Sequence, residues 1–444
     1  MSRKYLIETF GCQMNYHDSE QMAGLLEAAG YDRTADDADA DIVVINTCSV
    51  REHAEEKLYT RLGELRALQT SSGRDPVVVV AGCVAQQEGE SLFKRSDRIV
   101  DVVVGTRRVR MLPVLVEQAA HQRSAQVDLG AHDDVAFPFA VTRRDDQVRA
   151  WVTIIEGCNE YCSFCVVPYT RGHERMRPKA DILAEVRAAA AGGRREVQLL
   201  GQIVNHYQAP DDPACDFAGL LEAVHDVEGI DRIRFASPHP RHVSRRLIAA
   251  LRDLPKVCRH LHLPVQSGSD RVLKAMRRRY TREGFLDLVA EVRDALPGIG
   301  LSTDLIVGFP GETASEFDET LSLMEAVRFQ SVFSFKYSPR PNTLALKRLP
   351  DDVPEDEKTR RIVALQDLQR GIQLALHGAM VGRVEPVLVD AVSRRRATEI
   401  SGRTPGNIVV NLPGDPAWIG TVMPVRIERA GPNSLWGRAT ATSA

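Results

Sequence analysis

The first part of the chain alternates short runs of β-branched residues with stretches in which apolar residues recur at helical spacing. Such alternation is typical of parallel strands that are each covered by a helix. We therefore expect an α/β domain with a parallel sheet over residues 1–118. Its predicted strands are Lys4–Glu8, Asp41–Asn46, Val77–Ala81 and Ile99–Val104, and its main helical stretches are Ser19–Ala29 and Glu52–Leu68.

A second alternating series begins at Trp151 and contains six strand-like runs, of which the first five are followed by helical patterns. Six βα units predict a partial (β/α)6 barrel over residues 148–377, with 355–377 as a connecting helix. The stretch 119–147 is polar and aperiodic, so we expect a linker there. The predicted barrel strands are Trp151–Ile155, Glu196–Leu200, Arg232–Ala236, His260–Pro264, Gly300–Val307 and Ser331–Lys336, and the helical stretches are Ala180–Ala191, Phe217–Val227, Val243–Leu254, Ser269–Ala295 and Ala314–Val327.

The pattern changes again over residues 378–444, where short β-rich runs are separated by Gly, Pro and Asn. Short strands with frequent turns are typical of a small antiparallel β-barrel. The fold class is therefore predicted as α/β, with a small β-barrel following the two α/β parts.

Composition and charge narrow the class of protein. The 444 residues are 43% hydrophobic and 26% charged, which indicates a globular chain and excludes a disordered or coiled-coil one. No stretch approaches the roughly 18 apolar residues of a membrane helix, and Met1–Phe10 lacks the apolar run of a signal peptide. We expect a soluble, cytoplasmic protein with no membrane partner. Because the net charge is only −3, a nucleic-acid role would require local basic patches.

Eight cysteines are too few for a disulfide scaffold of this length and indicate metal or redox chemistry instead. Cys158, Cys162 and Cys165 have C-x3-C-x2-C spacing at the end of the first predicted barrel strand. Three thiolates on a cubane iron–sulfur cluster leave one iron open. That iron could chelate S-adenosylmethionine and, on electron transfer, release a 5′-deoxyadenosyl radical. The alternatives are three unrelated thiols and a structural zinc site, for which His173 is the nearest candidate for a fourth ligand.

With Phe164 before the third cysteine, this motif resembles the signature of the radical S-adenosylmethionine superfamily. Further segments resemble the methylthiotransferase family within it. The resemblance covers nearly the whole chain and implies a methylthiotransferase domain at 1–118, a radical barrel, and an RNA-binding TRAM domain at 378–444. One departure is Ile203, which stands where the family usually has Asn. The matching segments are TFGCQMN at 9–15, VVPYTRG at 166–172, LLGQIVNHY at 199–207, HLPVQSGSDRVLKAM at 262–276, STDLIVGFPGET at 302–313 and YSPRPNT at 337–343.

The resemblance implies an enzyme that converts N6-isopentenyladenosine at tRNA position 37 to its 2-methylthio derivative. One S-adenosylmethionine would supply the radical and another the methyl group. The implied partners are the tRNA anticodon stem-loop, a sulfur donor and an external electron donor of the flavodoxin or ferredoxin type. The alternatives are a sister enzyme acting on threonylcarbamoyladenosine in tRNA or on a ribosomal-protein aspartate, and a non-catalytic iron–sulfur RNA-binding protein.

Cys12, Cys48 and Cys83 are far apart in the sequence, but each falls just after a predicted strand. The carboxyl ends of parallel strands lie along one edge of a sheet, so we expect these thiols to converge. They are predicted to hold a second 4Fe–4S cluster whose open iron carries a sulfur species. Three unrelated buried thiols are the alternative. Cys215 and Cys258 have no partner spacing and are interpreted as structural.

Several other barrel strands end in polar or glycine-rich residues, which should open on the same face as the cysteine motif. By family resemblance this rim binds S-adenosylmethionine, although for any single residue a role in turning the chain is equally compatible. No catalytic residue is predicted beyond the cluster ligands. The predicted S-adenosylmethionine-binding residues are Gly201, Gln202, Ser237, Gln266, Ser267 and Gly308.

Two arginine runs are candidates for RNA contact, because phosphate binding requires clustered basic side chains. Arg277, Arg278 and Arg279 follow an amphipathic turn, where a solvated helix end is the ordinary explanation. Arg394, Arg395 and Arg396 lie on a predicted hairpin turn of the last domain. Trp418 and Trp436 in that domain are expected to be core residues rather than stacking platforms.

Overall fold

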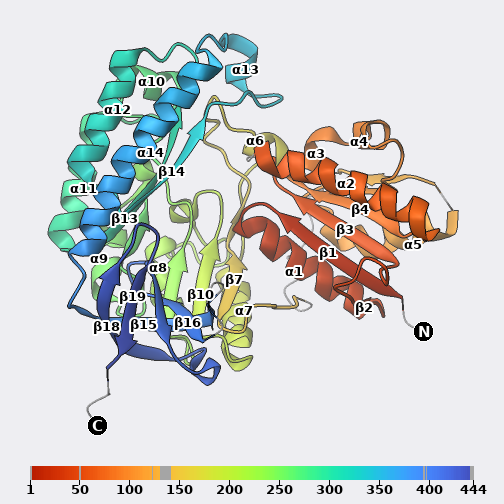
Figure 1. Cartoon of the computed structure of the whole chain (residues 1–444), viewed down its shortest axis with the longest axis horizontal. Coiled ribbons are helices and arrows are strands. Elements are labelled where there is room, and N and C mark those ends of the chain that lie inside the picture. Colours follow the sequence, from red (N-terminus) through yellow and green to blue (C-terminus); the bar gives the residue numbers. More distant parts are fainter. Residues whose placement is uncertain are drawn as a thin grey trace.

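The computed structural model of the chain describes residues 3–49, 52–122, 124–130, 142–393, 396 and 398–440. Three units follow one another along the chain (Figure 1). They are an N-terminal α/β unit, a central open barrel of parallel strands and a small closed β-barrel at the C-terminus. No helix of the described residues is long and apolar enough to cross a membrane.

The N-terminal unit is a six-stranded parallel sheet in the order β2-β1-β3-β4-β5-β6. Its central strand β3 is buried along its whole length, as the apolar run IVVINT requires of a strand covered on both faces. Helices α1 and α5 pack on one face, and α2, α3 and α4 on the other. The strands are β1 (Lys4–Phe10), β2 (Asp32–Arg33), β3 (Ile42–Thr47), β4 (Val77–Gly82), β5 (Val102–Val104) and β6 (Gln126–Asp128). The helices are α1 (Gln13–Ala28), α2 (Glu52–Ser72), α3 (Cys83–Glu88), α4 (Ser91–Arg95) and α5 (Leu112–Gln122).

The predicted linker starts too early, because this unit extends beyond residue 118. Helix α5 continues to Gln122, and β6 pairs in parallel with β5 as the edge strand. A three-residue polar edge strand is too short to show a period in the sequence, so only the partner strand reveals it. Most of the remaining expected linker, residues 131–141, lies outside the described residues.

The central unit is the predicted partial barrel, with six parallel strands in chain order from β7 to β14. A bridge between Ile233 and Val257 joins the two halves of the sheet. The expected helix over 269–295 is divided in two, because Arg277 and Arg279 adopt positive φ angles of 60° and 55°. The strands are β7 (Arg149–Thr153), β10 (Glu196–Leu200), β11 (Arg232–Phe235), β12 (His260–His262), β13 (Gly300–Val307) and β14 (Ser331–Lys336). The covering helices are α7 (Lys179–Ala191), α8 (Phe217–His225), α9 (Arg245–Asp253), α10 (Asp270–Ala275), α11 (Arg282–Ala295), α12 (Ala314–Val327) and α14 (Glu355–Gly378).

The C-terminal unit is a closed barrel in the order β15-β16-β17-β19-β18. Four neighbouring pairs are antiparallel, as the predicted small antiparallel barrel requires, and the barrel closes through one parallel pair, β17 with β19. Arg232 and Arg234 of β11 donate hydrogen bonds to backbone carbonyls of this unit, which fixes it at the amino ends of the barrel strands. The strands are β15 (Val384–Val392), β16 (Glu399–Arg403), β17 (Val409–Pro413), β18 (Val422–Ala430) and β19 (Leu435–Ala439).

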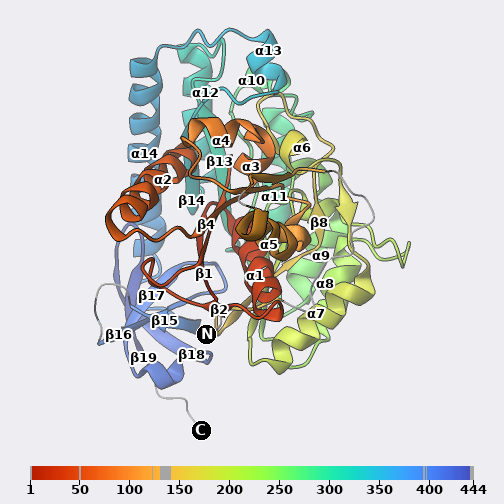
Figure 2. The same ribbon diagram turned by 90° about the vertical axis from the view of Figure 1, so that its right-hand side faces the viewer.

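The N-terminal unit is docked directly on the central barrel. In Figure 2 it lies in front of the barrel, between the β14 side and the side of α7 and α8. Helix α1 packs against β7, where Nδ1 of His17 and Oγ1 of Thr153 are 2.8 Å apart. Nε2 of His17 also lies 3.6 Å from Glu185 of α7. Buried polar contacts of this kind fix one relative orientation, because separating the units would leave them unpaired.

Candidate active site

The C-x3-C-x2-C motif forms a tight loop after β8 (Ile155–Glu156). Gly157 has φ +80°, and a Cβ there would lie 2.1 Å from the carbonyl oxygen of His173, so only glycine fits. The amide of Cys158 donates to the carbonyl of Gly172 at 3.0 Å. The amide of Cys165 donates to the carbonyl of Cys162, also at 3.0 Å. The predicted ligands Cys158, Cys162 and Cys165 therefore share one loop whose backbone is held by the segment around Gly172.

The thiols of this loop lie in a poorly solvated environment. Burial raises the pKa of Cys158 to about 12 and raises the pKa of Cys165 further. Arg278 supplies the compensating charge, since its Nη1 donates to Sγ of Cys162 at 3.4 Å. Positive charge and metal coordination both favour thiolates, so this site is suited to an iron cluster rather than to free thiols.

The structure corrects the prediction that Arg278 contacts RNA. Its side chain is buried and also donates to the carbonyl of Pro264 at 2.7 Å and to the hydroxyl of Tyr280 at 2.8 Å. An inward guanidinium with these partners is not available to an RNA backbone. Arg277 and Arg279 on either side of it are exposed, because their positive φ angles turn the three side chains in alternate directions.

The structure brings Cys12, Cys48 and Cys83 together. Cys12 is the N-cap residue of α1, Cys83 is the first residue of α3, and Cys48 follows β3. Strands β1, β3 and β4 are neighbours in the sheet, so their carboxyl ends share one edge. The thiol of Cys48 lies within hydrogen-bonding reach of both Cys12 and Cys83, and its one S–H can donate to either. The predicted convergence of three thiols is thus present in the fold.

The electrostatics of this trio favour thiolates at two positions. The hydrogen bond from Cys48 is the main cause that lowers the pKa of Cys12 to about 6 and that of Cys83 to about 7. The charge of Arg171 adds to both effects. Among the described residues, no three His, Cys, Asp or Glu side chains are grouped to hold a single metal ion. A cubane cluster offers a separate iron to each thiolate, so its ligands stand farther apart than those of one ion.

One segment of the central barrel contacts both cysteine sites. Arg171 is buried, and its Nη2 lies 2.6 Å from Oδ2 of Asp18 on α1, beside the Cys12 trio. The carbonyl of Gly172, the next residue, accepts the hydrogen bond from Cys158. Arg107 of the N-terminal unit donates to the carbonyls of Arg171 and His173 at 3.0 and 2.7 Å. Sequence reasoning missed Arg171, although it lies in the segment VVPYTRG that carried the family resemblance.

The predicted S-adenosylmethionine residues follow strands of the open barrel, as expected, and two of them have unusual backbones. Ser237 and Gln266 adopt φ angles of +59° and +76°, which non-glycine residues rarely adopt and which cluster at ligand sites. The Oε1 atom of Gln202 is buried and has no hydrogen-bond partner in the part of the chain that the structure describes. Gly201 follows β10 and packs closely on Ile155.

The remaining two residues have explanations within the protein. The Oγ atom of Ser267 accepts a hydrogen bond from the amide of Ser269, which caps the turn before α10. A Cβ at Gly308, whose φ is +68°, would lie 2.4 Å from Cγ of Lys358. The close neighbour at Gly308 is therefore a lysine stem, and its approach to an adenine stays a prediction. Ile203 is buried, so its side chain serves the core.

The C-terminal unit carries the other predicted RNA contacts. Arg394 and Arg395 lie outside the described residues, and Arg396 is exposed and paired with Glu399 at 3.0 Å. Neither tryptophan is buried, which corrects their expected core placement. Trp418 is partly exposed, whereas Trp436 is covered by the guanidinium of Arg429, 4.2 Å from its ring centre.

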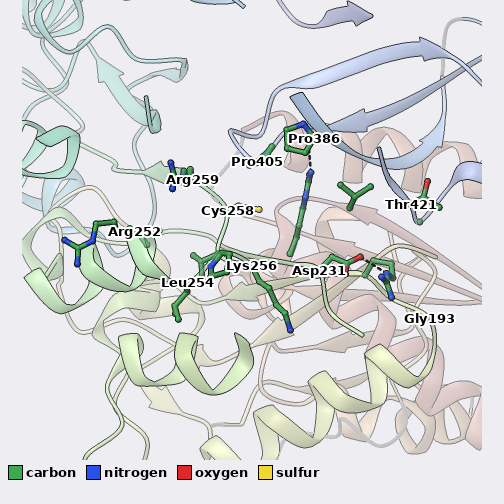
Figure 3. A pocket seen from close by; sticks show the side chains of 17 residues that line it. Gly193, Asp231, Arg252, Leu254, Lys256, Cys258, Arg259, Pro386, Pro405 and Thr421 are labelled. Atoms are coloured by element: carbon green, nitrogen blue, oxygen red, sulfur yellow. Dashed lines mark hydrogen bonds and ion pairs between the residues drawn. The ribbon is translucent and has the colours of Figure 1, made fainter. Parts of the chain in front are cut away.

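One cavity lies away from both cysteine sites. It has a volume of about 940 Å³ and opens between the barrel and the C-terminal unit (Figure 3). Pro386 and Pro405 face Lys256 and Cys258 across it. It contains none of the predicted ligands, so the cysteine geometry rather than this cavity defines the candidate active site.

Comparisons with known proteins agree with the division of the chain into three units. Residues 4–105 match the family described as "Uncharacterized protein family UPF0004". Residues 152–324 match the radical SAM superfamily, and residues 378–440 match the TRAM domain. Among solved structures, the radical S-adenosylmethionine methyltransferase TsrM from Kitasatospora setae, with cobalamin and a 4Fe–4S cluster bound, superposes with a TM-score of 0.56. It is 16% identical, over 78% of this chain and 74% of that one.

The fold and the cysteine loop thus define a radical S-adenosylmethionine protein. Two curated relatives are the tRNA-2-methylthio-N(6)-dimethylallyladenosine synthases of Geobacter metallireducens and Chromobacterium violaceum. Each is 46% identical to the chain, over 97% of both proteins in the first case and 98% of both in the second. The chain belongs to the family of tRNA-2-methylthio-N(6)-dimethylallyladenosine synthases.

Proposed function

We propose that the chain transfers a methylthio group to carbon 2 of N6-isopentenyladenosine at tRNA position 37. The observation that carries this proposal is the placement of two cysteine trios, from two different units, on either side of the segment that holds Arg171 and Gly172. Radical formation and sulfur delivery are separate chemical tasks, and two linked sites can divide them. The relatives named above carry this activity in their names.

Cys158, Cys162 and Cys165 are proposed to hold a 4Fe–4S cluster. Three thiols on one loop, with Arg278 donating to one of them, fit a cluster that keeps one iron open. When bound, this cluster would hold S-adenosylmethionine and supply the electron that splits it into methionine and a 5′-deoxyadenosyl radical. Arg278, which donates to Sγ of Cys162, would place one positive charge beside a cluster bound by this loop.

The rim of the barrel is proposed to bind S-adenosylmethionine. The strongest support is Oε1 of Gln202, a buried acceptor for which the described residues provide no hydrogen-bond partner. Ser237 and Gln266 place backbones of positive φ at two strand ends of this rim. The peptide groups of Gln266 pair with Asp304 and Ile306 of β13, so its side chain is the group proposed to reach the ligand.

Cys12, Cys48 and Cys83 are proposed to hold the second 4Fe–4S cluster. Lowered pKa values at two of the thiols and the nearby guanidinium of Arg171 fit a ligand set that must lose its protons. Here the open iron would carry the sulfur species, supplied by a separate sulfur donor. An electron donor of the flavodoxin or ferredoxin type would reduce the clusters.

The tRNA is proposed to contact the exposed Arg277 and Arg279 and the arginine run at 394–396, of which only Arg396 is described and is exposed. An unpaired anticodon-loop base can reach the barrel without melting a helix, as is usual in RNA recognition. For the units themselves we propose the boundaries 1–128, 148–377 and 378–444, the first lengthened from residue 118 to include β6.

The function is tested with anaerobically reconstituted protein, dithionite and S-adenosylmethionine. Isopentenylated tRNA is added, and its nucleosides are then separated and identified by mass spectrometry. We expect 5′-deoxyadenosine together with 2-methylthio-N6-isopentenyladenosine. Threonylcarbamoyl tRNA and ribosomal protein, offered in parallel, should stay unmodified. If the protein cleaves S-adenosylmethionine but methylthiolates one of these instead, the proposed substrate is wrong.

A further inference from the structure

Strand β14 presents two aromatic side chains away from the helices that cover the barrel. Side chains alternate between the two faces of a strand. Ser334 accepts a hydrogen bond from Gln366 of α14 at 3.1 Å, and Lys336 pairs with the start of the same helix. Phe333 and Phe335 therefore face the inside of the open barrel.

These two side chains are open to solvent. Phe333 is 50% exposed and Phe335 is 36% exposed, whereas Phe309 and Phe329 nearby are fully buried. Two adjacent exposed phenylalanines on the inner face of a barrel form an apolar surface that nothing within the described chain covers. Such surfaces mark ligand sites more often than scattered single residues do.

The neighbours of the Phe333–Phe335 patch give it one apolar end and one polar end. Phe335 is in register with Ile306 of β13, and Ile306 packs on the same small apolar cluster as Phe164 of the cysteine loop. Phe333 is in register with Asp304. The patch therefore runs from the neighbourhood of the cysteine loop towards a carboxylate.

The polar end is held in place by a histidine. The ring of His262 meets Phe333 edge to face at a centroid distance of 5.8 Å. Its Nδ1 lies 2.9 Å from Oγ of Ser302, and its Nε2 lies 3.4 Å from Oδ1 of Asp304. Asp304 keeps part of its side chain exposed, so one oxygen can accept a further hydrogen bond.

We propose that Phe333 and Phe335 bind the isopentenyl group of the target adenosine, while Asp304 accepts the hydrogen bond from its N6–H. The proposal rests on the proposed function and names the residues that would recognise its substrate. A branched five-carbon substituent on a secondary amine presents an apolar body beside one N–H donor, which is the chemistry that this surface complements. An unmodified adenosine would leave the two phenylalanines uncovered.

Binding of RNA by the full-length reconstituted protein tests this without turnover. Two anticodon stem-loop RNAs are compared that differ only in the isopentenyl group. Wild-type protein should prefer the isopentenylated RNA, and Phe333→Ser and Phe335→Ser should each reduce that preference by about tenfold, as expected when an apolar group loses its pocket. Affinity for the unmodified RNA should not change. Phe335→Leu, which keeps an apolar side chain, should retain most of the preference.

Val363→Ser is the matched control, because Val363 is also 50% exposed but lies on α14. It should behave as wild type. The proposed subsite is wrong if the Phe variants lose affinity equally for both RNAs. It is also wrong if their preference for the isopentenylated RNA is unchanged. If wild-type protein itself shows no preference and methylthiolates another substrate, the proposed function fails instead. Retained 5′-deoxyadenosine formation shows that the variants are folded.

Discussion

Arg171 of the central barrel and Asp18 of the N-terminal unit form a buried ion pair, with Nη2 of the arginine 2.6 Å from Oδ2 of the aspartate. Both side chains are almost fully buried, so each charge depends on the other for compensation. The backbone next to Arg171 accepts the hydrogen bond from Cys158, while Asp18 is on the helix that begins after Cys12. This pair therefore sets how the two cysteine sites are placed relative to each other.

Removing both charges of this pair should uncouple the two half-reactions. In the double variant Asp18→Asn, Arg171→Met, no unpaired charge is left buried, whereas Arg171→Met alone would cost about 3–5 kcal/mol. We expect 5′-deoxyadenosine formation to continue and methylthiolation to fall by about tenfold or more, since small misplacements of reacting groups cost this much. The measurement is the ratio of 5′-deoxyadenosine to methylthiolated nucleoside.

The control for this variant is Arg66→Met, which removes a surface arginine of the N-terminal unit that is paired with Asp97 at 2.8 Å. It should leave the ratio unchanged. Arg171→Lys keeps a positive charge beside Asp18, so its product ratio should lie between those of the wild type and the double variant. A wild-type ratio of 5′-deoxyadenosine to methylthiolated nucleoside in the double variant would show that the ion pair does not position the two cysteine sites.

The two cysteine trios should separate by function. Cys12→Ala, Cys48→Ala, Cys83→Ala is expected to lose roughly half of the bound iron, because one of two cubanes is removed. It should still form 5′-deoxyadenosine but should not methylthiolate tRNA. Iron analysis and product assays decide this. Full iron content, or any methylthiolation, contradicts the second cluster.

The reciprocal variant is Cys158→Ala, Cys162→Ala, Cys165→Ala. It should keep the other half of the iron and make no 5′-deoxyadenosine, because the loop can no longer present an iron to S-adenosylmethionine. Cys215→Ala serves as the matched control, since Cys215 is a buried cysteine outside both trios. Persistent cleavage of S-adenosylmethionine in the triple variant refutes the assignment of this loop.

Glu196 should make the stability of the barrel depend on acid pH. Burial alone would raise its pKa, but Arg234 and Arg149 outweigh burial and lower the pKa from 4.5 to about 2. At about 1.4 kcal/mol per pKa unit, the carboxylate contributes about 3 kcal/mol above pH 5. Because the folded pKa is lowered, this contribution is lost as the pH falls from about 5 towards 2.

Urea unfolding of the metal-free protein at several pH values measures this effect. Glu196→Gln should be less stable at neutral pH, because two buried arginines lose their partner, and its stability should vary less between pH 5 and 2. Glu222→Gln, at an exposed carboxylate paired with Arg246, should keep the wild-type dependence. If the free energy of unfolding varies with pH in the same way for the wild type and Glu196→Gln, Glu196 is not the source of the acid dependence.

The arginine turn of the C-terminal unit should bind tRNA by charge. Replacing Arg394, Arg395 and Arg396 with Ala should weaken tRNA binding and reduce the slope of log affinity against log salt by roughly 0.7–0.9 for each lost phosphate contact. Arg370→Ala on α14 is the control, because this exposed arginine lies outside the turn. An unchanged salt slope would argue against phosphate contacts at this turn.

The amino-acid sequence by itself determined the elements whose pattern is strong and local. Strands β10, β13 and β14 begin and end where their β-rich runs predict. Strand β10 is buried apart from Gln198, as expected of a parallel strand that is covered on both faces. The C-x3-C-x2-C loop is a local motif and needs no tertiary information. The convergence of Cys12, Cys48 and Cys83 could also be predicted, since parallel strands share one carboxyl edge.

Only the tertiary structure decided the features that depend on long-range partners. Arg278 turns inward because Cys162 and Pro264 accept its hydrogen bonds, although its sequence run looks like a solvated helix end. The parallel pairing of β17 with β19 and the edge strand β6 depend on neighbours that short polar segments do not specify. The pairing of Arg171 with Asp18 joins residues 153 positions apart in the chain. No local period records such a contact, because burial and partner geometry arise only when the units pack.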